Sequence, residues 1–186
     1  MPVTTLDPKT ALIIIDLQKG IVALPAVHPI GEVIANAATL AAAFRKLGLP
    51  VVLVNVAGGA PGRNEQAHSA REFPSGWTDL IPELNVQPAD HKVTKHTWGA
   101  FAHTDLDALL KEAGVTQVVL AGVATSIGVE STAREAYALG FNVTIATDAV
   151  TDLNLAAHEN SLTRIFPRLG ETGTTREIIG LLEKGA

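Results

Sequence analysis

The stretch VVLAGVATSIGVESTAREAYALGFNVTIA, residues 118–146, decides the fold class of this chain. It opens with an apolar run at 118–122, passes through a turn into a helix-like segment at 128–139, and closes with a second apolar run at 142–146. A glycine just past the last helical residue, here Gly140, is a common helix stop. Apolar strands joined through a helix are typical of a parallel sheet that is covered on both faces.

The same alternation continues through the rest of the chain. Further strands are predicted at 11–15, 51–56 and 90–94, and further helices at 30–47, 105–113, 156–168 and from Thr174 onward. This order predicts an α/β fold with a mostly parallel sheet between layers of helices. Residues 57–79 are rich in Gly, Pro, Asn and Ser and predict a long loop, a type of segment that often binds ligands. The length of 186 residues predicts one domain, residues 1–186.

Composition and charge restrict the class of protein. The chain is 47% hydrophobic and 18% charged, which is typical of a folded, core-rich domain. It has no cysteine, so a disulfide framework, a thiolate metal site and a cysteine nucleophile are excluded. A net charge of -5 without a basic run argues against nucleic acid as a partner. No apolar run reaches the ~20 residues of a membrane span, and the N-terminus lacks a signal-peptide pattern, so we expect a cytoplasmic protein without membrane contact.

The predicted sheet selects a candidate site. Open α/β sheets bind ligands at the carboxyl ends of their strands. This rule places Asp16, residues 55–59, Lys95, residues 121–128 and residues 147–148 at the rim of the site.

Asp16 has two interpretations of equal weight. It directly follows an apolar strand, and a partly desolvated carboxylate there would have a raised pKa suited to proton transfer. The alternative is a helix N-cap or a buried acid bound by backbone amides.

Lys95 lies in the segment VTKHTWGAF. Taken alone, a lysine just beyond a strand is best interpreted as a solvated residue. The alternative is that Trp98 and Phe101 form the walls of a pocket that shields its ammonium from water. A fixed ammonium would then stabilise a developing oxyanion or keep Asp16 ionised.

The turn at 122–134, GVATSIGVESTAR, leads from a strand into a helix. Backbone amides at such a helix start form an anion or oxyanion site. The alternative is a plain turn with Thr125 or Ser126 as the helix cap. Neither hydroxyl has an evident base beside it in the sequence, so a serine-type nucleophile is disfavoured.

The histidines do not predict a metal centre, because none of the six forms an H-x-x-x-H pair or an H-E-x-x-H motif. His158 is best interpreted as a capping or packing residue. Trp77 either closes a pocket or anchors the long loop, and the sequence favours neither.

Three segments together resemble the isochorismatase-like (cysteine hydrolase) family. They are IIIDLQ at 13–18, TKHTWGAFAHTDL at 94–106 and GVATSIGVESTAREAYALGFNV at 122–143, and the resemblance extends over about residues 10–175. It implies a three-layer α-β-α sandwich with a sheet of about six strands. The family's catalytic Asp, Lys and Cys match Asp16, Lys95 and Gly128.

The resemblance also implies an oxyanion turn at Val123, Ala124 and Gly128, with a cis peptide between Val123 and Ala124. The remaining expected contacts to the substrate are Gln18, Trp77, Trp98, Phe101 and Thr125.

Glycine at position 128 departs from most of the family, because no thioester can form there. Isochorismatases, which also carry glycine at this position, protonate a vinyl ether with the Asp while water attacks. Their turn tyrosine is matched here by Ala124, which puts isochorismate itself in doubt. Residues 55–70 lack the D-x-H metal motif of nicotinamidases, so that branch and its metal are excluded.

The expected function is therefore hydrolysis of a small molecule with no cofactor and no metal, in a homodimer or homotetramer as the resemblance implies. One alternative is a binding or scaffold protein that has lost catalysis. Another is a cysteine enzyme into which the glycine was introduced.

Overall fold

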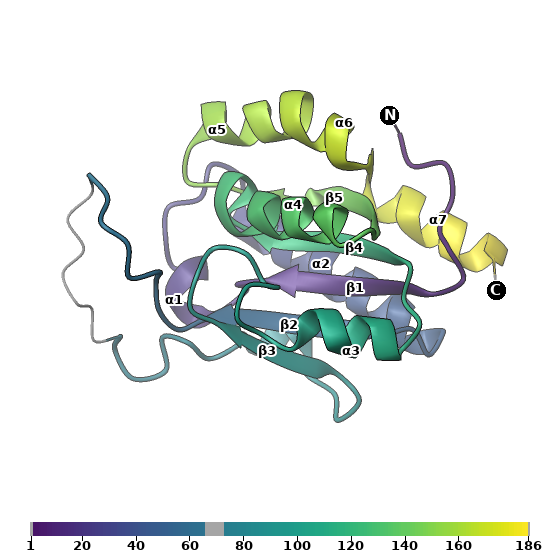
Figure 1. The fold of residues 1–186 in the computed structure, drawn as a ribbon, viewed down its shortest axis with the longest axis horizontal. Coiled ribbons are helices and arrows are strands. Elements are labelled where there is room, and N and C mark those ends of the chain that lie inside the picture. The colour runs from purple at the N-terminus through teal and green to yellow at the C-terminus, as the bar shows by residue number, and fades with distance from the viewer. Residues whose placement is uncertain (1, 66–72, 186) are drawn as a thin grey trace.

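The computed structural model describes residues 2–65 and 73–185 and contains a six-stranded parallel sheet in the order β3-β2-β1-β4-β5-β6 (Figure 1). The strands are β1 (Thr10–Ile15), β2 (Val51–Val56), β3 (His91–Lys95), β4 (Gln117–Val123), β5 (Asn142–Thr151) and β6 (Glu171–Gly173). The predicted α/β sandwich with about six strands is confirmed.

Helices cover both faces of the sheet (Figure 1). They are α1 (Lys19–Val22), α2 (Ile30–Lys46), α3 (Leu106–Glu112), α4 (Glu130–Ala138), α5 (Leu155–Asn160), α6 (Phe166–Leu169) and α7 (Thr175–Gly185), with a short 3₁₀ turn η1 at Pro82–Leu84. In β1, Ala11, Ile13 and Ile15 join the core under α3, α4 and α6. The intervening Leu12 and Ile14 join the core under α2 and α7. Because successive strand residues point to opposite faces, a strand buried on both faces has to be apolar throughout.

Several boundaries differ from the predictions. The helix expected at 128–139 is preceded by a π-helical turn, η2 (Thr125–Val129), and α4 follows it directly. The helix expected at 156–168 is interrupted by a second π-helical turn, η3 (Ser161–Ile165). The described parts of the predicted loop at 57–79 contain no helix or strand, while residues 66–72 of it lie outside the described residues.

The prediction that residues 147–148 lie at the rim of the site is wrong, because β5 continues to Thr151. The pairing of β5 with β4 shifts register between Leu120 and Gly122. Thr147 and Asp148 therefore lie inside the strand and not at its end. Asp148 accepts hydrogen bonds from the backbone amide and hydroxyl of Thr175, at 2.7 and 2.8 Å. Its carboxylate therefore caps α7 and does not face the site.

Gly122 brings β4 close to β1 at the carboxyl edge of the sheet. Its φ is 115°, and a Cβ at this position would overlap the carbonyl oxygen of Ile15. Only glycine allows this approach, so it fixes the end of β4 beside the residue that precedes Asp16.

No helix within residues 2–65 and 73–185 has the length and apolar character that a membrane crossing requires.

Candidate active site

Asp16 follows the last residue of β1 in a left-handed backbone conformation, with φ 52°. Such a conformation is uncommon outside glycine and persists where the surroundings hold it. Here the amide of Asp16 donates to Val54 at 2.9 Å, and its carbonyl accepts from Gln18 at 2.8 Å. The residue that precedes α1 is Gln18, so the N-cap interpretation of Asp16 is wrong.

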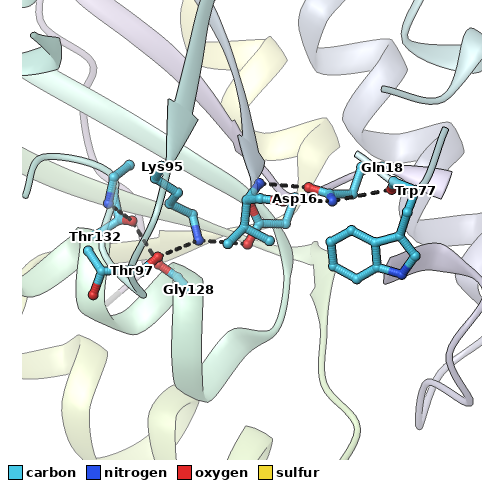
Figure 2. A network of polar contacts seen from close by, with 9 residues as sticks. Asp16, Gln18, Trp77, Lys95, Thr97, Gly128 and Thr132 are labelled. Carbon is cyan, nitrogen blue, oxygen red and sulfur yellow. Dashed lines mark hydrogen bonds and ion pairs between the residues drawn. The ribbon is translucent and has the colours of Figure 1, made fainter. Parts of the chain in front are cut away.

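Lys95 is the last residue of β3 and reaches across the end of β2 to Asp16 (Figure 2). Its Nζ lies 2.8 Å from Asp16 Oδ2, and it also donates to the carbonyl of Thr97 at 3.2 Å. The Lys95 and Asp16 side chains are 2% and 7% exposed. The interpretation of Lys95 as a solvated residue is therefore wrong, and the two charges form a buried ion pair.

The two carboxylate oxygens of Asp16 have different surroundings. Oδ2 accepts from Lys95, whereas Oδ1 is buried and has no hydrogen-bond partner among the described residues. Burial raises the pKa of Asp16 from its ordinary 3.8 to about 6, against the opposing effects of the Lys95 charge and hydrogen bond. A carboxyl group with this pKa exchanges protons close to neutral pH, as a general acid or base must.

Gly128 completes the cluster from the turn after β4. A Cβ at this position would lie 3.3 Å from Asp16 Oδ2 and 3.0 Å from Ile15 Cγ2. A side chain at 128 would therefore stand directly beside the carboxylate. The glycine also has a close neighbour that the sequence did not predict: Thr132 donates to the Gly128 carbonyl at 2.7 Å and accepts from the amide of Ala100 at 3.1 Å (Figure 2).

The turn between β4 and α4 contains the expected cis peptide, Val123–Ala124, which is confirmed. The amides of Ile127 and Val129 both donate to the Ala124 carbonyl at 3.1 Å. The amide of Ser126 donates to Asp152 Oδ2 at 2.7 Å. These bonds do not involve the amides of Ala124 and Gly128, whose role as oxyanion donors stays a prediction.

Gln18 and Trp77 fasten the long loop to the sheet. The Gln18 side chain is fully buried, donates to the carbonyls of Val56 and Trp77 at 3.0 and 3.3 Å, and accepts from the Val56 amide at 2.7 Å. Trp77 packs on Gly20, where a Cβ would overlap the indole, and stacks on Phe73 with 4.2 Å between ring centroids. Both residues thus have a structural task, and the anchor interpretation of Trp77 is the one that these contacts favour.

Three other expected substrate contacts have surroundings that the sequence did not predict, and their contact with a substrate stays a prediction. Trp98 is 63% exposed. Phe101 lies in the hydrophobic core, with its ring 5.9 Å from that of Phe141. Thr125 is fully buried, and its hydroxyl hydrogen-bonds His158 Nδ1 at 2.8 Å. A basic nitrogen therefore does lie beside this hydroxyl, contrary to the expectation from sequence.

The ion pair lies apart from three hollows on the surface of the described residues. Three surface hollows of about 400, 560 and 430 Å³ lie elsewhere, and Asp16, Lys95 and Gly128 line none of them. Among residues 2–65 and 73–185 there is no group of three or more His, Cys, Asp or Glu placed to hold a metal ion.

Comparison with known proteins places this arrangement in a family. The family model described as the isochorismatase domain matches residues 10–177. The isochorismatase family protein YwoC of Bacillus subtilis (strain 168) is 46% identical over 178 residues, covering 92% of this chain and 93% of its own. The ureidoacrylate amidohydrolase RutB of Pseudomonas syringae pv. syringae (strain B728a) is 29% identical over 171 residues, covering 76% of this chain and 70% of its own.

A solved structure agrees with the sequence relatives. An isochorismatase family protein from Burkholderia thailandensis superposes with a TM-score of 0.92 at 45% identity, covering 96% of this chain and 98% of that one. The matched region includes Asp16, Lys95 and Gly128. The chain belongs to the isochorismatase family of hydrolases.

Proposed function

We propose that this protein hydrolyses a small-molecule enol ether without a covalent enzyme intermediate, with Asp16 as the group that gives and takes the proton. Lys95 is its electrostatic partner, and Gly128 leaves space for the substrate. The observation that carries the proposal is Asp16 Oδ1, which is buried and has no partner within residues 2–65 and 73–185, while Oδ2 is bonded to Lys95. An unpaired buried acceptor is costly, and a reacting group at this position would satisfy it.

The proposed reaction begins with protonated Asp16. Its proton goes to the terminal carbon of the enol ether, and the electron pair of the double bond forms the new C–H bond. The ether carbon becomes oxocarbenium-like and is attacked by water, which returns a proton to the Asp16 carboxylate. In the resulting hemiketal the bond from carbon to the ether oxygen breaks, and the proton of the new hydroxyl passes to the departing oxygen, which gives a ketone and an alcohol. The Lys95 ammonium, 2.8 Å away, stabilises the carboxylate that is left after the first step.

Glycine at 128 suits this reaction better than amide hydrolysis. A protonated enol ether is electrophilic enough for water, whereas an amide carbonyl usually requires a strong nucleophile such as a thiolate. With no side chain at 128, no atom of that residue stands between the turn and Asp16 Oδ2, where a Cβ would lie only 3.3 Å from the carboxylate oxygen.

Access is the strictest requirement on the proposal. Because the Asp16 and Lys95 side chains are 7% and 2% exposed, a substrate has to displace the segments that cover them. The second candidate function is a binding protein without turnover. The observation that favours it is glycine at position 128, where the family's nucleophile is missing.

Replacement of Asp16 by Asn tests the proposal. Product formation from isochorismate, from other enol ethers and from ureidoacrylate is followed by mass spectrometry in the parent, in Asp16→Asn and in Asp148→Asn. We expect Asp16→Asn to lower enol-ether turnover about 100-fold or more, because the proton donor is lost. Asp148→Asn is the matched control, because Asp148 caps α7.

Equal turnover in the parent and Asp16→Asn would overturn the proposal. Ligands that raise the melting temperature without any product in the parent would instead establish the binding function. The homo-oligomer and the cytoplasmic location expected from the sequence stay predictions.

A further inference from the structure

A second buried polar cluster is bonded to the same turn that contains Gly128. It consists of Thr125, Asp152 and His158, together with Thr151 and His28. Asp152 and His158 are 2% and 5% exposed, and Thr125 and Thr151 are fully buried. None of these side chains contacts the Asp16–Lys95 pair in the described bonds.

The side chain of Asp152 holds the turn by bonding a backbone amide of the turn. Its Oδ2 accepts from the Ser126 amide at 2.7 Å. Its Oδ1 accepts from the amides of Leu153 and Asn154 at 2.8 and 3.1 Å. Both oxygens are thus used, and the carboxylate joins the end of β5 to the first residues of η2. Hydrogen bonds to a charged acceptor are stronger than neutral ones, so this is a firm attachment.

His158 holds the turn by bonding the side chain of Thr125. Its Nδ1 bonds the Thr125 hydroxyl at 2.8 Å, and its ring lies 4.6 Å from the ring of His28. Burial lowers the pKa of His158, and the neighbouring His28 acts in the same sense, against the opposing charges of Asp152 and Glu159. The neutral imidazole is therefore the form that pairs with the hydroxyl.

The two attachments are on consecutive residues, Thr125 and Ser126, which directly follow the cis peptide and precede Gly128. On the other side Thr132 fixes the Gly128 carbonyl. The position of Gly128 over Asp16 thus depends on bonds from both sides of the turn. A misplacement of ~1 Å at a reacting centre is enough to lower a rate about 100-fold.

We propose that Thr125, Asp152 and His158 are positioning residues. They hold the turn at 124–128 in the position that places Gly128 beside Asp16 Oδ2. The consequence for catalysis rests on the proposed function, but the positioning itself does not. It is measurable without a substrate, because the chain has no cysteine and Gly128→Cys introduces a single thiol beside Asp16 Oδ2.

The test measures the rate at which iodoacetamide alkylates this thiol, over a range of pH. In the Gly128→Cys background, Thr125→Val removes the hydroxyl but keeps the shape of the side chain, while Thr125→Ser keeps the hydroxyl. Thr144→Val is the control, because it removes an equally buried hydroxyl that bonds Gln117 at 2.9 Å, nearer the start of β5.

We expect Thr125→Val to raise the alkylation rate about fivefold or more, because a released turn opens more often to solvent. The pH dependence should move toward that of an ordinary cysteine, about 8.5. Thr125→Ser and Thr144→Val should both stay within about twofold of the Gly128→Cys parent. Asp152→Asn should act like Thr125→Val, because an amide cannot accept at both of the positions where Asp152 accepts.

Equal alkylation rates in Thr125→Val and Thr144→Val would overturn the proposal, whatever the turnover assay shows. If Gly128→Cys does not fold, amide hydrogen exchange of residues 124–128 in Thr125→Val, Thr125→Ser and Thr144→Val provides the same comparison in the glycine background. Faster exchange in Thr125→Val alone supports the positioning role, and unchanged exchange overturns it.

Discussion

Two ion pairs, each joining an aspartate to a base distant in sequence, are built in opposite ways. In the first, Arg45 of α2 donates from Nε to Asp90 Oδ1 at 3.0 Å and from a terminal nitrogen to Asp90 Oδ2 at 2.7 Å. The Gln87 amide also donates to Oδ2 at 2.7 Å, and Arg45 further bonds the Leu84 carbonyl at 3.1 Å. Both oxygens of Asp90 are therefore satisfied.

The Asp16–Lys95 pair has a single direct bond, and Asp16 Oδ1 has no partner among the described residues. Asp16 also has a positive φ and a pKa raised by burial to about 6. A buried charge with an unfilled acceptor is a weak way to stabilise a fold. The comparison supports our proposal that the Lys95 pair serves chemistry, whereas the Arg45 pair is built for stability.

Replacing Lys95 should give the largest effect on activity. In Lys95→Met the carboxylate of Asp16 loses the counter-charge that lowers its pKa, so this pKa should rise above about 6. We expect enol-ether turnover to fall about 100-fold or more, because the developing carboxylate is no longer stabilised. If Asp16 acts as the acid, turnover in the parent falls as the pH rises through about 6. This descending limb of the pH–rate profile should move to higher pH in Lys95→Met.

The pH–rate profile of the residual activity is the measurement for this variant. The control is Lys19→Met, since the Lys19–Asp79 pair is 2.9 Å long, close to the 2.8 Å of the Lys95–Asp16 pair, but exposed. A descending limb at the same pH in the parent and in Lys95→Met would contradict the assignment of that limb to Asp16.

Replacing Asp90 should have a smaller effect, and on a different property. Asp90→Asn leaves the Arg45 guanidinium without its charged partner in a site where the Asp90 side chain is 1% exposed. We expect the free energy of unfolding to fall by about 3 kcal/mol, with the turnover of the folded protein unchanged. Denaturant unfolding and active-site-normalised turnover are measured side by side. A loss of turnover without a loss of stability would reverse the roles given to the two pairs.

The fold could be predicted because its signal is local. Uninterrupted apolar strands such as ALIII in β1 can only belong to a sheet that is covered on both faces. The strand β6 was missed because its three residues, ETG, carry no such pattern. The end of β5 was misplaced because polar Thr147 and Asp148 suggested a strand end, although the structure uses Asp148 to cap α7.

The site could be predicted only in part. Asp16, Lys95 and Gly128 were found from the order of their motifs and do converge. The hydrogen bonds made by Thr132, Asp152 and His158 join residues 32, 26 and 33 positions apart, respectively, which a single sequence does not reveal. Phe101 and Trp98 were assigned to the site by residue type, but residue type does not determine whether an aromatic ring faces the core or the solvent.

The central claim is that the Asp16 carboxyl exchanges its proton near neutral pH beside an ammonium and a position without a side chain. A ¹³C NMR titration of the Asp16 side-chain carboxyl carbon, assigned by its loss in Asp16→Asn, measures this directly. We expect a pKa of about 6, matching the descending limb of the pH–rate profile. A pKa at or below the ordinary 3.8 would show an aspartate held permanently ionised by Lys95 and would contradict its role as the proton donor.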